Sequence, residues 1–228
     1  MKLVLHNYWR SSASHRVRIG LELKGLPYDY VAVNIVKHEQ GADAYRAKNP
    51  MMQVPTLEIT EDDGAVYVLT QSLPILEYLE ERFPNPAILP FRESAGRDVR
   101  FLRARARALA EIVNSGIQPF QNLSTTKKVH AMGGDTAAWT REFIESGLHA
   151  FQSVVQEIWA SERAPFCAAD TPTIADCCLV PQLASARRFG VDLARFRTLV
   201  GIEERCLALP AFQRAAPEAQ PDAGTPAS

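Results

Sequence analysis

The pattern of apolar residues changes near residue 84, and this change constrains the fold of the 228-residue chain more than any other feature. Before it, short runs of strand-forming residues alternate with helical spacing, and beyond it strand patterns nearly disappear. Three prolines between residues 84 and 90 favour a boundary there. We therefore expect a mixed domain over residues 1–84 and an all-helical domain over 91–216. Residues 217–228 lack an apolar anchor and are expected to form a mobile tail.

The order of elements in the first domain predicts a small mixed sheet. The expected elements are a strand at 3–5, a helix at 14–24, a strand at 28–35, strands at 56–59 and 66–69, and a helix capped by Ser72. The short strand–helix–strand crossover implies that the first two strands are parallel. The turn at Gly64 predicts an antiparallel hairpin. In the second domain we expect helices at 93–123, 136–159 and 173–189, the last beginning with a capping box of Thr173 and Asp176.

The composition argues against several classes of protein. The chain has 25 Lys and Arg against 26 Asp and Glu, and its net charge of −1 argues against a dedicated nucleic-acid-binding protein. No apolar run approaches the roughly 20 residues that a membrane-spanning helix requires. The four cysteines lack the spacing of metal ligands, so no metal site is expected. Cys177 and Cys178 are adjacent and do not easily pair, which favours the reducing cytoplasm.

A polar loop, Arg10-Ser11-Ser12-Ala13-Ser14, separates the first expected strand from the first helix. Its hydroxyl groups meet the unpaired N–H groups and the positive end of the helix dipole. This setting stabilises an anion such as a thiolate. Taken alone, the loop has a simpler interpretation, in which one serine caps the helix.

Two further segments carry groups suited to a peptide ligand. A cis bond between Val54 and Pro55 would turn the Val54 backbone outward as a free hydrogen-bonding edge, although a trans bond is more frequent. Gln71 and Ser72 precede a helix whose N–H groups suit a carboxylate, although a plain cap is the simpler interpretation. In a sheet of the expected order, the three segments converge at one end. Together they describe a receptor for a small thiol peptide, for which glutathione is the obvious candidate.

Five segments, in this order, resemble the zeta class of glutathione transferases, which includes the maleylacetoacetate and maleylpyruvate isomerases. The segments are RSSASHRVRIGLELKG, NPMMQVPTLEI, QSLPILEYLEERFP, GIQPFQNLS and TPTIADCCLVPQLASARRFGVDL. The resemblance extends from the first strand to about Gln220. It implies an α/β domain with a thioredoxin-like fold followed by an all-α domain, with glutathione as cofactor. It also implies a homodimer.

The resemblance assigns roles to particular residues. Ser11 corresponds to the catalytic serine that stabilises the glutathione thiolate. The glutathione-binding residues that it implies are Ser11, Ser12, Ser14, Gln40, Val54, Pro55, Gln71, Ser72, Gln118, Asn122 and Ser124. Arg10 and Arg188 match basic positions that bind the carboxylates of the substrate.

The implied reaction is the glutathione-dependent cis–trans isomerisation of maleylacetoacetate to fumarylacetoacetate, in tyrosine and phenylalanine catabolism. Reversible addition of the thiolate to the double bond would allow it to rotate. Three alternatives remain open. The first is a maleylpyruvate isomerase of aromatic degradation, and the second is a transferase or dehalogenase acting on small α-halo acids. The third is a non-catalytic glutathione-binding scaffold.

The chain departs from the usual family motif at two positions. Ala13 and His15 replace a cysteine and a tryptophan. Loss of that thiol should spare the isomerase reaction if Ser11 holds the thiolate. His15 resembles some bacterial maleylpyruvate isomerases, whereas GIQPFQNLS resembles the maleylacetoacetate enzymes, so the two features point to different substrates.

Overall fold

The computed structural model describes residues 1–92, 98–160 and 164–224. The chain divides into two compact units, each described here by itself. The first combines Met1–Ala87 with the segment from Leu209 to the end of the described chain, and the second comprises Ile88–Ala208. Among the described residues, no helix is both long and apolar enough to cross a membrane.

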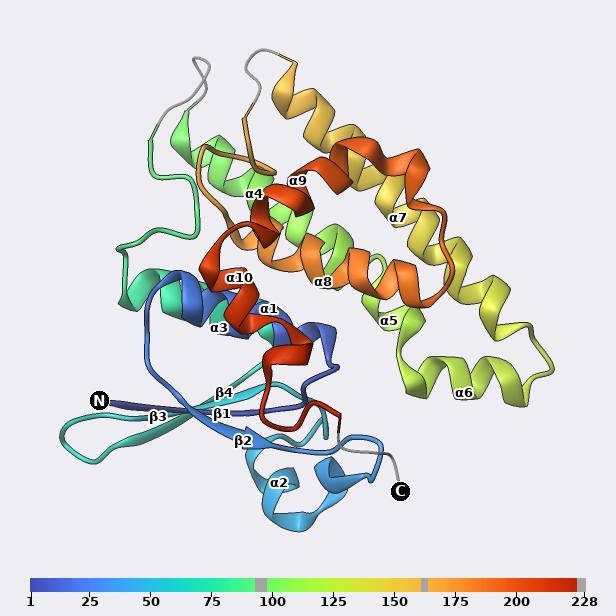
Figure 1. Ribbon diagram of the computed structural model, residues 1–228. Helices are drawn as coiled ribbons and strands as arrows, with labels where there is room; N and C mark the ends of the chain where they lie inside the picture. The colour runs from blue at the N-terminus through green and yellow to red at the C-terminus, as the bar shows by residue number, and fades with distance from the viewer. Residues whose placement is uncertain (93–97, 161–163, 225–228) are drawn as a thin grey trace. The chain divides into compact units, whose positions relative to one another are not determined.

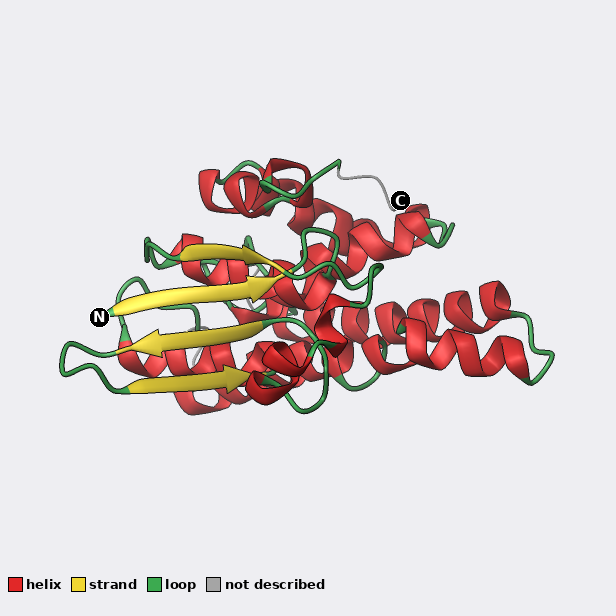
Figure 2. Ribbon diagram, turned by 90° about the horizontal axis from the view of Figure 1, so that it is seen from below, coloured by secondary structure: helices red, strands yellow, loops and turns green. Residues whose placement is uncertain are grey.

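A four-stranded sheet organises the first unit. Its elements are β1 (Lys2–Asn7), α1 (Ser12–Leu23), β2 (Asp29–Ala32), the 3₁₀ helix η1 (Glu39–Gly41), α2 (Asp43–Lys48), β3 (Thr56–Thr60), β4 (Val66–Thr70), α3 (Ser72–Arg82), α10 (Pro210–Ala215) and the 3₁₀ helix η3 (Pro217–Ala219). The strand order is β2-β1-β3-β4. The predicted parallel pairing of β1 with β2 and the antiparallel hairpin of β3 and β4 are confirmed, and Figure 2 shows β3 running opposite to the other three strands.

Alternation along β1 places its apolar side chains on one face of this sheet. Leu3 and Leu5 are buried in one cluster with Leu57 of β3, Val17 of α1 and Ile75 of α3. Helix α2 lies on the other side of the sheet, as Figure 1 shows, and its Lys48 pairs with Glu58 of β3. Helices α1 and α3 are thus packed against the Leu3 and Leu5 face of the sheet.

The second unit is helical over its described residues. Its elements are α4 (Val99–Asn114), α5 (Gln118–Gln121), α6 (Leu123–Ala131), α7 (Thr136–Trp159), α8 (Ile174–Arg188), the 3₁₀ helix η2 (Leu193–Phe196) and α9 (Arg197–Leu207). Helix α8 packs against α4 and α9. The predicted capping box is confirmed, because the Thr173 side chain accepts from the backbone of α8 and Asp176 accepts from Thr173 N at 2.7 Å.

Several expected boundaries differ from the structure. The long helix expected at 93–123 is divided into α4, α5 and α6, because Asp98 caps α4 and the chain turns after Ser115. The start of that prediction, 93–97, lies outside the described residues. Strand β2 is shorter than the expected 28–35. Gln71, rather than Ser72, occupies the cap position of α3.

The largest difference concerns the end of the chain. The sequence analysis assigned residues up to 216 to the helical domain and the rest to a mobile tail. In the structure the segment from Leu209 onward belongs to the first unit, where α10 packs against α1. Gln220 is buried and donates to Arg214 O and Ala216 O, both at 2.8 Å. This anchor is polar, which explains why an apolar pattern did not reveal it.

A buried lysine joins the end of α1 to the end of α3. Lys24 Nζ donates to Glu80 Oε2 at 2.9 Å, to Phe83 O at 2.6 Å and to Pro86 O at 2.8 Å. Both charged side chains are almost completely buried. The buried ammonium group is therefore satisfied by a buried carboxylate and two backbone carbonyls.

We expect Lys24→Met to lower the free energy of unfolding by about 3–5 kcal/mol, because it leaves the buried Glu80 carboxylate without its cation. Urea denaturation measures this change. Lys2→Met, which removes an ion pair to Asp29 whose two side chains are mostly exposed, is the control and should change stability by less than about 1 kcal/mol. The double variant Lys24→Met/Glu80→Met should recover part of the loss. Equal effects of the two single variants would contradict this account.

Candidate active site

The serine that caps α1 keeps its hydroxyl hydrogen available. Ser11 has an extended backbone, with φ −69° and ψ 119°, and its Oγ accepts a hydrogen bond from Ser14 N at 3.2 Å. A hydroxyl group has one hydrogen to donate besides its acceptor lone pairs. The Ser14 bond uses only a lone pair, and Ser11 is partly exposed. Ser11 Oγ can therefore donate to an anion at the N-terminus of α1.

The other residues of this loop differ in accessibility. Ser12 is partly exposed and begins α1. Ser14 is completely buried, and its Oγ accepts a weak bond from Tyr8 N at 3.5 Å. The structure therefore gives the Ser14 hydroxyl a place in the interior of the unit and does not bring it to the surface. Arg10 is exposed, with its guanidinium over the Trp9 ring at 5.5 Å from the ring centre.

Two buried arginines make the surroundings of this loop positive. Arg16 and Arg18 are at most 1% exposed, and Arg16 Nη1 donates to Ser72 Oγ at 3.1 Å. His15 is also buried, and burial together with the nearby Arg18 lowers its pKa well below the usual value for histidine. His15 is thus neutral near pH 7, and the positive potential comes from the arginines. Such a potential favours a bound anion.

The backbone edge beside the third strand is open, as the resemblance predicts. The Val54–Pro55 peptide bond is cis. Within the described part of the chain, no hydrogen bond uses the N–H or the carbonyl of Val54. Tyr45 Oη and Asn49 Nδ2 donate to Gln53 O at 2.6 and 2.7 Å, and so hold the preceding residue in place. Sequence analysis missed the roles of Tyr45 and Asn49, although Asn49 opens the motif that was recognised.

The start of α3 combines an unusual backbone with a buried serine. Gln71 has φ 70°, a conformation that residues other than glycine rarely adopt and that concentrates at functional sites. Its side chain is exposed, whereas Ser72 is 3% exposed and accepts from Arg16. Arg16 therefore ties the start of α3 to α1, a role that the sequence motif did not reveal. Gln40 lies in η1, and its buried Oε1 has no hydrogen-bond partner among the described residues.

The predicted residues of the second unit lie in a chain of amide side chains. Gln182, which is completely buried in α8, exchanges hydrogen bonds of 3.1 and 3.2 Å with Gln121. Gln121 Nε2 also donates to Gln118 Oε1 at 3.1 Å, and Gln118 Nε2 donates to Asn122 Oδ1 at 2.8 Å. This orientation leaves the amide hydrogens of Asn122 at the outer end. Ser124 is exposed in α6 and is not part of the amide chain.

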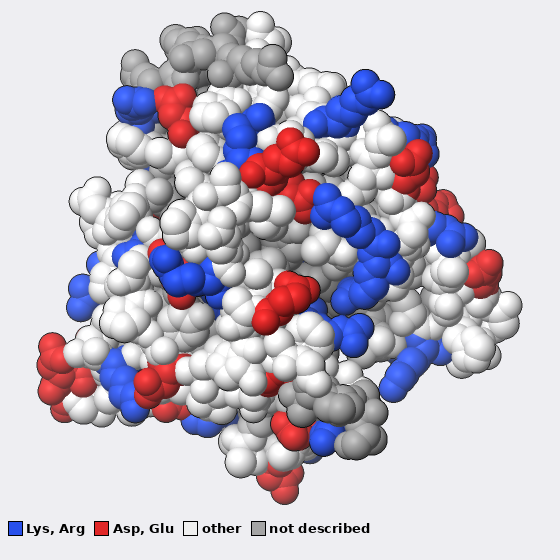
Figure 3. Space-filling view, viewed as in Figure 1, with Lys and Arg blue, Asp and Glu red and all other residues white. Residues whose placement is uncertain are grey.

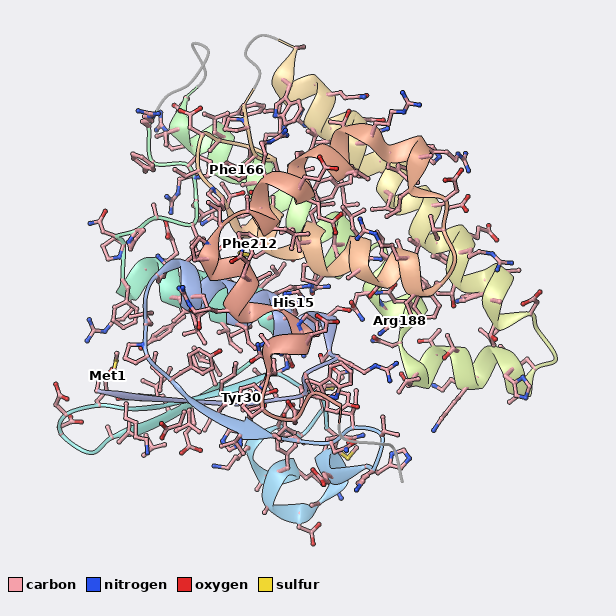
Figure 4. All side chains as sticks on the ribbon, in the orientation of Figure 1. Met1, His15, Tyr30, Phe166, Arg188 and Phe212 are labelled. Carbon is pink, nitrogen blue, oxygen red and sulfur yellow. The ribbon has the colours of Figure 1, made fainter. Side chains whose placement is uncertain are left out.

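Arg188 lies at the exposed C-terminal end of α8, in the second unit. Its Nη2 donates to Ser185 Oγ at 3.4 Å, and its guanidinium lies over the Phe189 ring, 5.1 Å from the centre. Figure 4 labels this side chain. The stacking limits where the guanidinium can lie, which favours specific over diffuse binding of a carboxylate.

The structure thus brings Arg16 and Ser72 together in the first unit, and Gln118 and Asn122 together in the second. Among the described residues, no group of three or more His, Cys, Asp or Glu is placed to hold a metal ion. All four cysteines are free and buried. Figure 3 shows basic and acidic side chains interspersed over most of the face in view, as the near-zero net charge suggests.

Comparisons with known proteins identify the family of the chain. Residues 5–87 match the model of the glutathione S-transferase N-terminal domain. The chain is 44% identical to a maleylpyruvate isomerase of Ralstonia, covering 96% of this chain and 98% of the relative. It is 42% identical to the maleylacetoacetate isomerase of Mus musculus, covering 99% and 96%.

Comparisons with solved structures indicate the same family. A maleylacetoacetate isomerase of Anaeromyxobacter dehalogenans with bound glutathione is 49% identical, with a TM-score of 0.84 over 97% of this chain and 98% of that one. The holo structure of a bacterial maleylpyruvate isomerase, described as a zeta-class transferase, is 43% identical, with a TM-score of 0.83 over 96% and 99%. With relatives this similar over almost its whole length, the chain belongs to the zeta class of glutathione transferases, the family of the maleylacetoacetate and maleylpyruvate isomerases.

Proposed function

We propose that this protein is a glutathione-dependent cis–trans isomerase that converts maleylacetoacetate to fumarylacetoacetate in aromatic amino acid catabolism. The observation that carries the proposal is the geometry of Ser11. Its hydroxyl caps α1 through a lone pair and keeps its hydrogen to donate, beside a helix N-terminus and two buried arginines. A thiolate is the form of glutathione that such a site stabilises.

The residues present suit glutathione. The Val54 backbone can pair with an extended peptide, and the N–H groups at the start of α3, after Gln71, suit a carboxylate. In the second unit, Gln118 Nε2 donates to Asn122 Oδ1, which leaves the amide hydrogens of Asn122 to bind carbonyl or carboxylate oxygens. When bound, glutathione supplies a thiolate that adds reversibly to the maleyl double bond, which allows rotation about the resulting single bond.

The chain's own residues then bind and orient the substrate. Arg10 and Arg188 are exposed guanidinium groups, each stacked on a neighbouring aromatic ring, and we assign them to the two carboxylates of a maleyl diacid. Ser11 holds the thiolate by its hydroxyl hydrogen. Neutral His15 is buried beneath the loop and takes no part as an acid or base near pH 7.

Maleylpyruvate is the second candidate substrate, because the Ralstonia relative of this name is 44% identical and His15 resembles that group. Both compounds carry the same cis alkene between carboxyl and carbonyl groups. Selection between them depends on the shape of the substrate pocket. We propose the maleylacetoacetate reaction first because the GIQPFQNLS segment favours it.

We also propose that the enzyme is a cytoplasmic homodimer. The β4 strand exposes Val66 and Tyr67, at 56% and 58%, next to the exposed Val68. A second copy would remove this apolar surface from water. Sedimentation velocity at micromolar concentration should give about twice the 25.3 kDa chain mass, and Tyr67→Glu should shift the equilibrium toward a single chain. A monomer at all concentrations would contradict the dimer.

The function is tested by following each maleyl compound by absorbance, with and without glutathione. The proposal expects turnover that requires glutathione and does not consume it, with the higher kcat/KM on maleylacetoacetate. Higher kcat/KM on maleylpyruvate would select the second candidate. Glutathione binding without turnover would support a scaffold, and consumption of glutathione with α-halo acids would support a transferase.

We expect Ser11→Ala to lower kcat about 100-fold at saturating glutathione, because one donor to a charged reacting group is lost. Ser11→Thr keeps both the cap and the hydroxyl and should retain most of the activity. Ser153→Ala, on the exposed face of α7, is the matched serine control. Thermal unfolding separates the loss of the cap, which costs about 1 kcal/mol, from the loss of chemistry. Full activity of Ser11→Ala would mean that another group holds the thiolate.

Arg188→Leu should raise KM for the maleyl substrate by about 10- to 100-fold, the effect of losing a charged hydrogen-bonding group. Arg188→Lys should recover part of the affinity, because an ammonium group lacks the planar fork of arginine. The dissociation constant of glutathione should stay unchanged. Arg141→Leu, an exposed charge on α7, is the control. An unchanged KM in Arg188→Leu would remove this residue from the substrate site.

A further inference from the structure

The C-terminal segment ends against the loop that carries Ser11. After α10 and η3, the chain returns to the sheet, and Asp222 Oδ2 accepts a hydrogen bond from Trp9 N at 3.2 Å. Asp222 Oδ1 accepts a second bond from the hydroxyl of Tyr30 on β2. Figure 1 shows this red segment passing beside α1 toward β2, and Figure 4 labels Tyr30 and Phe212 along its course.

Arg18 connects the same segment to the same loop from inside the unit. Its side chain is completely buried, and Nε donates to Ala215 O at 3.0 Å. Nη1 donates to Asn7 Oδ1 at 2.9 Å, and Nη2 donates to Trp9 O at 3.0 Å. One guanidinium thus bonds both the C-terminal segment and the loop.

These contacts engage both hydrogen-bonding groups of the Trp9 backbone. Its N–H donates to Asp222 and its carbonyl accepts from Arg18. Ser11 follows two residues later and is itself bound through its N–H to Tyr8 O at 3.0 Å. The direction of the Ser11 hydroxyl therefore depends on a backbone that residues outside the loop fix. Exposed loops without such bonds move more freely.

The carboxylate of Asp222 is suited to binding Trp9 N and the Tyr30 hydroxyl at the same time. A carboxylate has two oxygens that accept hydrogen bonds, and here one faces each donor. Burial and the bond to Asp222 raise the pKa of Tyr30, so its phenol remains a donor. An asparagine of the same shape has one accepting oxygen, and its NH₂ group would face one of the two donors.

We propose that Asp222 is a positioning residue for Ser11, acting through Trp9 N to hold the loop of residues 8–11 in the geometry that the reaction requires. The C-terminal segment thus acts on the active site through the backbone of this loop. This inference rests on the proposed function for its effect on catalysis, whereas its structural core, the bond between Asp222 and Trp9, can be tested without glutathione.

The first measurement is hydrogen exchange of residues 7–14 in the glutathione-free protein. Asp222→Asn and Asp222→Ala should speed exchange of this peptide roughly tenfold or more, while the core strands β1 and β3 keep their protection. Tyr30→Phe leaves the bond to Trp9 in place and should have a smaller effect. Glu218→Gln removes a charge from an exposed position of the same segment and is the matched control.

The second measurement concerns bound glutathione. Titration of the thiolate absorbance should show a higher thiol pKa in Asp222→Asn than in the wild type. The value of kcat should fall about tenfold with a small change in KM, since a displacement of about 1 Å can cost up to about 100-fold in rate. A purely structural role would lower the melting temperature and leave the thiol pKa of the folded fraction unchanged.

The outcomes separate this inference from the proposed function. Unchanged exchange of residues 7–14 in both Asp222 variants would overturn the inference. So would a thiol pKa in Asp222→Asn equal to that of the wild type, where the wild type does bind the thiolate. A wild type that does not bind glutathione as a thiolate would overturn the proposed function, and the exchange data would still decide whether Asp222 positions the loop. If both Asp222 variants fail to fold, the exchange rate of the Trp9 N–H in the wild type decides: slow exchange supports the inference, and exchange as fast as that of an exposed amide overturns it.

Discussion

The buried guanidinium of Arg18 is the interaction on which the first unit depends most. It lies in the interior of a small unit and bonds groups from β1, from the loop after β1 and from the C-terminal segment. Burial lowers its pKa from the usual value, yet arginine stays protonated because its ordinary pKa is so high. The cost of burying the charge is offset by oxygen acceptors arranged around it. Removing any of those acceptors would leave a donor of the buried guanidinium without a hydrogen bond. The three segments therefore meet at Arg18.

Hydrogen-bond donors and positively charged groups also dominate the active site. The Ser11 hydroxyl, the helix N-termini of α1 and α3, and Arg16 all offer hydrogens or positive potential. The second unit also offers donors. They come from the amide chain that runs from Gln182 to Asn122 and from the guanidinium of Arg188. Each unit, taken by itself, presents donors. Ligands rich in carboxylates and a thiolate supply the matching acceptors, which is the charge pattern of glutathione with a maleyl diacid.

Local signals in the sequence predicted much of this arrangement. The parallel first strands, the hairpin at Gly64 and the capping box at Thr173 each depend on a few neighbouring residues. The helix expected from residue 14 begins at Ser12, with Ser11 as its cap. The contacts that the sequence did not predict join residues far apart in the chain: Asp222 and Trp9 are 213 residues apart, and Gln182 and Gln121 are 61 apart. The resemblance assigns Ser14 and Ser72 to the glutathione site, and the structure shows that both are buried, which a serine motif by itself does not reveal. A polar anchor such as Gln220 leaves no apolar periodicity to detect.

The amide chain shows why buried polar residues matter for recognition. Gln182 and Gln121 exchange two hydrogen bonds, an arrangement that is the same whichever way both amides are turned. The direction is therefore set further out, where Gln118 Oε1 accepts and its Nε2 donates to Asn122. Once one amide of such a chain is fixed, its neighbours follow, because two donors or two acceptors facing each other are costly when buried. A ligand oxygen at the outer end therefore selects the orientation of the whole chain, and a ligand donor there would have to reverse it.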